Sequence, residues 1–159
     1  MRKAWMAGLV LALATAATPA AADWQYTKWG MSPKELEAAA PQPLRANDAK
    51  YQHANRITMP GKGLWLPLYS GAYETGGFRF KADFYFDPQD RLSEVMLTAV
   101  DAPQCDALLQ TLEGKYGKPE VLAAGLGQWR DPAASNLVGF LWLKTCVVTY
   151  RLLPSAKGL

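Results

Sequence analysis

The sequence is poor in the side chains that most enzyme active sites use. It has one histidine, His53, and two cysteines, Cys105 and Cys146, among 159 residues. It contains no Gly-x-Ser-x-Gly nucleophile motif, no phosphate-binding loop and no dinucleotide-binding fingerprint. One histidine and two distant cysteines also lack the spacing of zinc ligands. We therefore expect no catalytic residue, metal site or cofactor in this chain.

The first 22 residues have the features of a secretory signal peptide. Arg2 and Lys3 precede an apolar run at residues 6–17, and small residues lead up to Asp23. The apolar run is shorter than the roughly 20 residues that a membrane span requires. No cysteine near the cleavage point could carry a lipid anchor. We expect residues 1–22 to be removed and residues 23–159 to form one soluble periplasmic domain with no membrane span.

Without this segment the chain carries almost no net charge. Loss of Arg2 and Lys3 leaves 15 basic residues against 14 acidic ones. No run of like charges remains that would attract nucleic acid or an anionic membrane. The composition therefore predicts a partner other than nucleic acid, and it does not set the oligomeric state.

Both cysteines lie in the exported part of the chain. Exported proteins meet an oxidising compartment, where disulfides form and persist. We predict a disulfide between Cys105 and Cys146. The alternative is a pair of inert buried thiols, since cysteine is a common small apolar residue in protein cores.

The clearest structural pattern is a hairpin over residues 78–99. Four phenylalanines alternate with polar and charged residues from Phe78 to Phe86, which places them on one face of a strand. Asp87 and Pro88 favour a tight turn, and a return strand with a bulge beside the turn follows. The apolar face must be covered, and a helix predicted immediately afterwards, at residues 103–116, is the expected cover.

Similar patterns complete the fold. Ser32 and Glu35 form a capping box that starts a short helix, and Pro41 ends it. Residues 45–56 read as a loop and residues 57–73 contain a strand, while strands are expected at residues 120–130, 136–144 and 145–153. The predicted fold is α+β, with the order helix, three strands, helix, three strands. It is an antiparallel sheet of about six strands with two helices packed on one face.

Several short motifs resemble a group of small exported bacterial domains. The run from Gly30 to Leu36 is similar to the opening of outer-membrane assembly lipoproteins of the small protein A type and of the beta-lactamase inhibitor protein. Residues 84–95 resemble their central hairpin, and Gly117 to Pro119 resembles their helix ending. The resemblance implies a non-catalytic domain that binds protein partners. This chain has no lipid-attachment cysteine, so membrane anchoring does not carry over.

The aromatic residues supply the candidate binding site. If Trp65, Tyr69 and Tyr85 lie on the face opposite the helices, they form an exposed patch suited to a protein partner or an apolar ligand. The alternative is that these rings fill the core or pack beneath residues 45–56.

Three functions follow from these patterns. The first is a binding module for another envelope protein, acting through Trp65 and Tyr69 or an unpaired sheet edge beside them. The second is a carrier of a small apolar ligand between sheet and helices, in a cavity lined by residues such as Phe80, Phe84 and Leu112. The third is a hydrolase that uses His53 or the acidic residues around the hairpin, which are Asp83, Asp87, Asp90 and Glu94.

Overall fold

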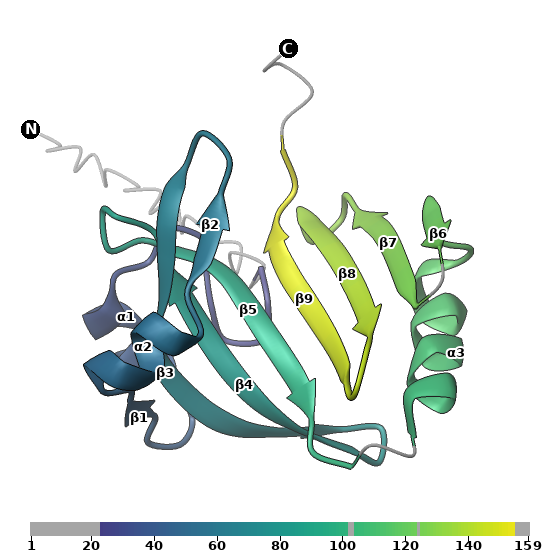
Figure 1. Ribbon diagram of the computed structural model, residues 1–159, viewed down its shortest axis with the longest axis horizontal. Helices are drawn as coiled ribbons and strands as arrows, with labels where there is room; N and C mark the ends of the chain where they lie inside the picture. The colour runs from purple at the N-terminus through teal and green to yellow at the C-terminus, as the bar shows by residue number, and fades with distance from the viewer. Residues whose placement is uncertain (1–22, 102–103, 124, 155–159) are drawn as a thin grey trace, which may run out of the picture.

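A computed structural model describes residues 23–101, 104–123 and 125–154 (Figure 1). It has an α+β fold. The strands of the sheet follow the order β1-β3-β4-β5-β9-β8-β7-β6, and β2 pairs with the N-terminal end of β3. All pairs of neighbouring strands are antiparallel. Within the described ranges no helix is long and apolar enough to cross a membrane. The predicted signal peptide lies outside these ranges.

The predicted class and the antiparallel sheet are confirmed, whereas the element count is only roughly right. The described residues form three helices and nine strands. In chain order these are α1 (Pro33–Ala39), β1 (Arg45–Ala46), α2 (Ala49–Ala54), β2 (Ile57–Met59), β3 (Gly63–Thr75), β4 (Phe78–Phe86), β5 (Leu92–Ala99), α3 (Cys105–Tyr116), β6 (Val121–Ala123), β7 (Leu126–Asp131), β8 (Asn136–Trp142) and β9 (Cys146–Leu152).

The β4–β5 hairpin forms as the alternation predicts. Phe84 pairs with Val95, and the register shifts between Tyr85 and Phe86, where the bulge beside the turn was expected. The carboxylate of Asp87 accepts hydrogen bonds from the backbone N–H groups of Gln89 and Arg91, which closes the turn. Sequence pattern and turn chemistry together therefore fix the register of the central hairpin.

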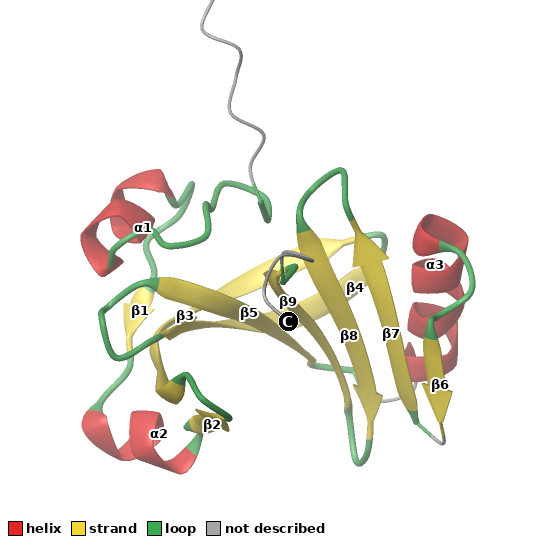
Figure 2. Cartoon of the chain, turned by 90° about the horizontal axis from the view of Figure 1, so that it is seen from above, coloured by secondary structure: helices red, strands yellow, loops and turns green. Residues whose placement is uncertain are grey.

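The main core lies on one face of the sheet. Helices α1 and α3 both pack there, through Leu36 of α1 and through Leu108 and Leu112 of α3. The phenylalanines of β4 supply the opposing surface, and Figure 2 shows both helices on the same side of the curved sheet. The capping box of Ser32 and Glu35 starts α1 as predicted. We call this side the core face and the opposite side the outer face.

The segment predicted as a loop at residues 45–56 contains β1 and α2. The Asp48 carboxylate accepts a hydrogen bond from the Tyr51 backbone N–H and caps α2 at its N-terminus. Helix α2 lies on the outer face, so the expectation of helices on one face holds for α1 and α3 only (Figure 2). It has no buried residue, and a six-residue polar helix carries no apolar stripe by which a sequence pattern could reveal it.

Two predicted single strands are in fact hairpins. Within residues 57–73, β2 and β3 are joined by a turn in which Gly61 and Gly63 have positive φ angles of 71° and 87°. Within residues 120–130, β6 and β7 pair with each other, and Gly125 precedes β7 with a φ of 75°. Glycine adopts these left-handed angles without a steric penalty. Each chain reversal therefore occurs where the sequence has a glycine.

The predicted disulfide is present. Cys105 at the start of α3 and Cys146 at the start of β9 are bonded, with Cα atoms 5.5 Å apart. Both residues are buried in the core. The bond fixes the N-terminal end of α3 to the central strands of the sheet.

Removing this bond should lower the stability of the fold. A closed loop of 41 residues corresponds to about 4 kcal/mol in the chain-entropy treatment. We expect the double variant Cys105→Ser, Cys146→Ser to show a lower urea midpoint with a similar m-value, measured by circular dichroism. The unmodified chain in reductant should behave in the same way. Equal midpoints with and without the bond would contradict the prediction.

Candidate functional site

The outer face of the sheet is divided into a covered part and an open part. Over β3 and β4, the outer face carries Ser70, Lys81, Asp83 and Tyr85, and α2 covers it. Over β7, β8 and β9, none of the described elements covers this face, as Figures 1 and 2 show. The open part and its border are therefore the places on this face where a partner or ligand could bind.

Asp83 is the centre of the contacts under α2. Its carboxylate accepts hydrogen bonds from the hydroxyl groups of Tyr51, at 2.9 Å, and Ser70, and it forms an ion pair with Lys81 at 3.0 Å. The Tyr85 hydroxyl donates to the backbone carbonyl of Asn55 at 3.0 Å, which holds the end of α2. A buried carboxylate is stable when all its partners are supplied in this way. The network docks α2 and has no free reactive group.

The three candidate aromatics do not form an exposed patch. Trp65 and Tyr85 lie on the outer face but are 4% and 2% exposed. Tyr69 lies on the core face, where its ring contacts Phe86 at a centroid distance of 6.4 Å. The alternative interpretation, that the rings pack beneath residues 45–56, is confirmed for Tyr85, whose hydroxyl bonds to Asn55. Tyr69 is paired with β1 and with β4, and Trp65 is paired with β2, so neither residue lies on an unpaired edge of β3.

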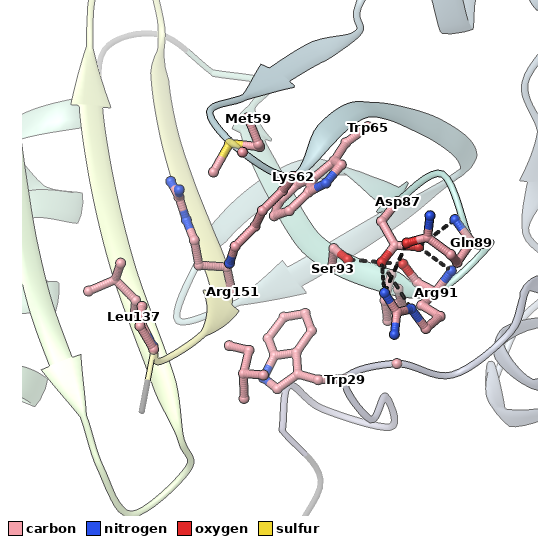
Figure 3. Close-up of a pocket in the computed structure, with 15 residues that line it drawn as sticks. Trp29, Met59, Lys62, Trp65, Asp87, Gln89, Arg91, Ser93, Leu137 and Arg151 are labelled. Atoms are coloured by element: carbon pink, nitrogen blue, oxygen red, sulfur yellow. Dashed lines mark hydrogen bonds and ion pairs between the residues drawn. The ribbon is translucent and has the colours of Figure 1, made fainter. Parts of the chain in front are cut away.

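A basin of about 650 Å³ lies at the border between the covered and open parts. The β2–β3 hairpin, the turn at residues 87–91 and the end of β9 form its walls. In Figure 3, Lys62 and Arg151 lie on one side, and Asp87 and Arg91 lie on the other, with Trp29 and Trp65 between them. Three cationic side chains and two indoles thus border one recess.

The acid–base pair at one side of the basin is internally satisfied. Arg91 and Asp87 form an ion pair at 2.9 Å. Burial raises the pKa of Asp87, but hydrogen bonds from the Arg91 side chain and from the backbone N–H groups of Arg91 and Gln89 outweigh burial and lower the pKa overall. This pair therefore stays charged and holds the turn in place.

The acid at the other side is buried. Glu94 on β5 lies directly across from Arg151 on β9, is 2% exposed and pairs with the Arg151 Nε at 3.3 Å. Burial raises the pKa of Glu94 to about 7, although the charge of Arg151 acts in the opposite direction. Near neutral pH, Glu94 therefore changes between a charged partner of Arg151 and a neutral one.

The open part of the outer face carries a row of apolar side chains. Leu126 pairs with Leu141, and Leu141 pairs with Val147, so the three lie side by side across β7, β8 and β9. Leu126 is 46% exposed, and Leu141 and Val147 are half-buried. Leu143, in the adjoining β8–β9 turn, is 75% exposed. We call Leu126, Leu141, Val147 and Leu143 the apolar row.

A second recess lies on the core face beneath α3. It has a volume of about 320 Å³ and includes Phe80 and Leu112, as the carrier hypothesis requires. Phe84, the third residue of that hypothesis, lines a different recess beside Trp24 and Tyr26. Burial raises the pKa of Tyr150, whose hydroxyl shares a hydrogen bond with Tyr116 in this recess. We call this recess the α3 cavity.

The residues of the hydrolase hypothesis do not converge. His53 is exposed on α2. Asp83 is engaged under α2, Asp87 holds the turn and Glu94 pairs with Arg151. Among the described residues, no group of three or more histidine, cysteine, aspartate or glutamate side chains could hold a metal ion. No nucleophile–base pair is formed by these side chains.

Comparisons with protein-family models, with curated proteins and with solved structures found no match to this chain. The function must therefore be argued from the site itself.

Sequence reasoning found part of the site. It identified Trp65 as a candidate, and Trp65 lines the basin. It missed Arg151 and Lys62, because a single cation in a strand or turn carries no pattern. It also missed the apolar row, whose members come from three strands. Its one available signal was the alternation of Leu137, Gly139 and Leu141 along β8.

The buried carboxyl of Glu94 should make the stability of the fold depend on pH. Because its pKa is raised from 4.5 to about 7, the folded state holds a proton that the unfolded chain releases. The contribution of Glu94 to the free energy of unfolding is fully present below pH 4.5 and is lost as the pH rises through 7. Its upper limit is about 3 kcal/mol. Glu94→Gln should flatten this fall in unfolding free energy, measured by urea titration from pH 5 to 8. His53→Ala should leave it unchanged; an unaltered slope in Glu94→Gln would refute the assignment.

Proposed function

We propose that the chain is an exported, non-catalytic module that binds another envelope protein through the open part of its outer face. The apolar row is the observation that carries this proposal. Its leucines and valine are partly exposed on a sheet face that none of the described elements covers. Exposed apolar side chains gathered on one face are characteristic of protein interaction sites.

Two further features support this proposal. The basin adjoins the open face through Leu137 of β8 and Arg151 of β9, so a partner on the apolar row has a polar recess beside it. The disulfide is of the kind found in exported proteins. The resemblance to small exported bacterial domains likewise implies a domain that binds protein partners. The proposal replaces the aromatic patch of Trp65, Tyr69 and Tyr85 with the apolar row.

Site-specific photo-crosslinking tests this interface. A benzophenone side chain in place of Leu141 should give a protein adduct in intact cells that export the chain. The same group in place of Ala38, which is exposed on α1 at the core side of the sheet, is the matched control. Leu126→Glu should reduce the Leu141 adduct about tenfold or more, since burying one leucine contributes about 1.5–3 kcal/mol. Equal adducts at Leu141 and Ala38, or an adduct unaffected by Leu126→Glu, would refute the interface.

The α3 cavity supports a second candidate, a carrier of a small apolar ligand. Its walls include Phe80, Leu97, Leu108 and Leu112, and the hydroxyl groups of Tyr116 and Tyr150 add a polar end. Apolar cavities of this size, with a few convergent polar groups, are typical of small-molecule sites. The disulfide holds α3 over the cavity from one end.

The dye 1-anilinonaphthalene-8-sulfonate is a suitable probe of this cavity. If the cavity accepts apolar ligands, the dye should fluoresce with the folded protein, and Leu112→Trp should fill the space and weaken binding about tenfold. Leu109→Trp, at a half-buried position on the same helix that does not line the cavity, should leave binding unchanged. Equal binding by both variants, with circular dichroism showing both folded, would exclude the carrier function.

A further inference from the structure

The basin has a cation without a partner. Arg91 is neutralised by Asp87 at 2.9 Å, and Arg151 shares Glu94 at 3.3 Å. Lys62, in the turn of the β2–β3 hairpin, is exposed, and its side chain forms no ion pair or hydrogen bond with any described residue. Arg151 contacts Glu94 through Nε, and no hydrogen bond within the described part of the chain uses its terminal nitrogens. Lys62 and Arg151 are therefore available to an anion in the basin.

We propose that the basin binds a carboxylate of an acidic segment in the protein partner, between Lys62 and Arg151, and that Glu94 competes with that carboxylate for Arg151. This inference rests on the proposed function, because it takes the partner on the apolar row to extend along β8 from Leu141 to Leu137, which lines the basin. It adds to that function that the segment of the partner entering the basin is acidic. Arginine and lysine side chains are the groups that proteins use to bind carboxylates.

The remaining walls favour a peptide over a small free anion. Trp29, Met59, Leu137 and Leu152 line the basin and offer apolar surface to neighbouring side chains of a bound segment. The buried indole N–H of Trp65 has no acceptor among the described residues. Because this N–H is closed to solvent, a backbone carbonyl of a bound segment reaches it only if the β2–β3 hairpin shifts outward. An unsatisfied buried donor is costly, so gaining an acceptor favours binding.

Glu94 occupies the position of an internal competitor. It lies across from Arg151 in the β5–β9 ladder and is almost fully buried, so it cannot leave Arg151 by moving into solvent. Protonation removes its charge and frees Arg151 for an external carboxylate. Several other charged or titratable groups lie on the packed elements around it: Tyr85, Asp83 and Lys81 on β4, Tyr51 on α2, Arg151 on β9, and Lys62, Asp87 and Arg91 around the basin.

Binding of the amidated, acetylated peptide Glu-Glu-Glu-Glu to the disulfide-bonded chain from Asp23 to Leu159 tests the proposal. The indole N–H resonances in ¹H–¹⁵N spectra supply an internal control, because Trp29 and Trp65 line the basin while Trp129 and Trp142 do not. The first two resonances should shift on titration and the other two should not. The apparent Kd should rise about fivefold from pH 6 to pH 8, over which the peptide carboxylates remain ionised.

Three variants separate the contributions. Glu94→Gln should bind at pH 8 as tightly as the unmodified chain binds at pH 6, and its Kd should not change with pH. Lys62→Ala should weaken binding about threefold to fivefold, as expected for one exposed charge. Lys34→Ala, an exposed lysine on α1, is the matched control and should bind normally. His53→Ala should keep the pH dependence, since it removes the only histidine.

The outcomes distinguish this inference from the function on which it rests. No shift of the Trp29 and Trp65 resonances, or a pH dependence retained in Glu94→Gln, would overturn the inference. Citrate binding as tightly as the peptide would overturn the assignment to a protein segment in favour of a free carboxylate. If the photo-crosslink at Leu141 forms as expected while the peptide fails to bind the unmodified chain, the proposed function stands and only the inference fails.

Discussion

The buried carboxylate of Asp83 is the constraint on which the arrangement of the outer face depends. Strand β4 is covered on both faces, with phenylalanines against α1 and α3 on one side and Asp83 under α2 on the other. An ionised carboxylate in that position is tolerated only if its hydrogen-bond partners are supplied. Tyr51, Ser70 and Lys81 supply them. These contacts seat α2, and the chain leaving α2 then forms the hairpin that walls the basin.

The features that could be predicted from the sequence are those set by neighbouring residues. The phenylalanine alternation from Phe78 to Phe86 determines which side of β4 faces the core, and the Asp87 turn sets the register with β5. Ser32 and Glu35 start α1 by reciprocal hydrogen bonds within one turn. The disulfide needed only two cysteines and an oxidising compartment. Each of these signals can be read without knowing where distant segments lie.

What could not be predicted depends on contacts between distant segments. The charged side of β4 suggested a solvent-exposed face, yet Asp83 and Tyr85 are buried, because α2 brings Tyr51 and the Asn55 carbonyl to them. The sequence left open whether Trp65 is exposed or packed, and it is buried. The Asp48 cap was the one local sign of α2, and it is too common in turns to identify a six-residue helix. The basin and the apolar row are assembled from different strands and have no sequence pattern of their own.

The arrangement of the two halves explains why one part of the outer face is open. The series α1-β3-β4-β5 and the series α3-β7-β8-β9 have the same element order, and their last strands, β5 and β9, pair at the centre of the sheet. Between α1 and β3 the chain inserts β1, α2 and β2. Strand β1 pairs at the edge of the sheet, and α2 covers the outer face of the first half. Between α3 and β7 the chain inserts only β6, which extends the sheet at its edge. The second half buries Trp129, Val138 and Phe140 on its core face but leaves Leu126, Leu141 and Val147 uncovered on its outer face. A partner protein on that face would supply the cover that α2 and the β2–β3 hairpin give to the first half, and the basin lies where the two covers would meet.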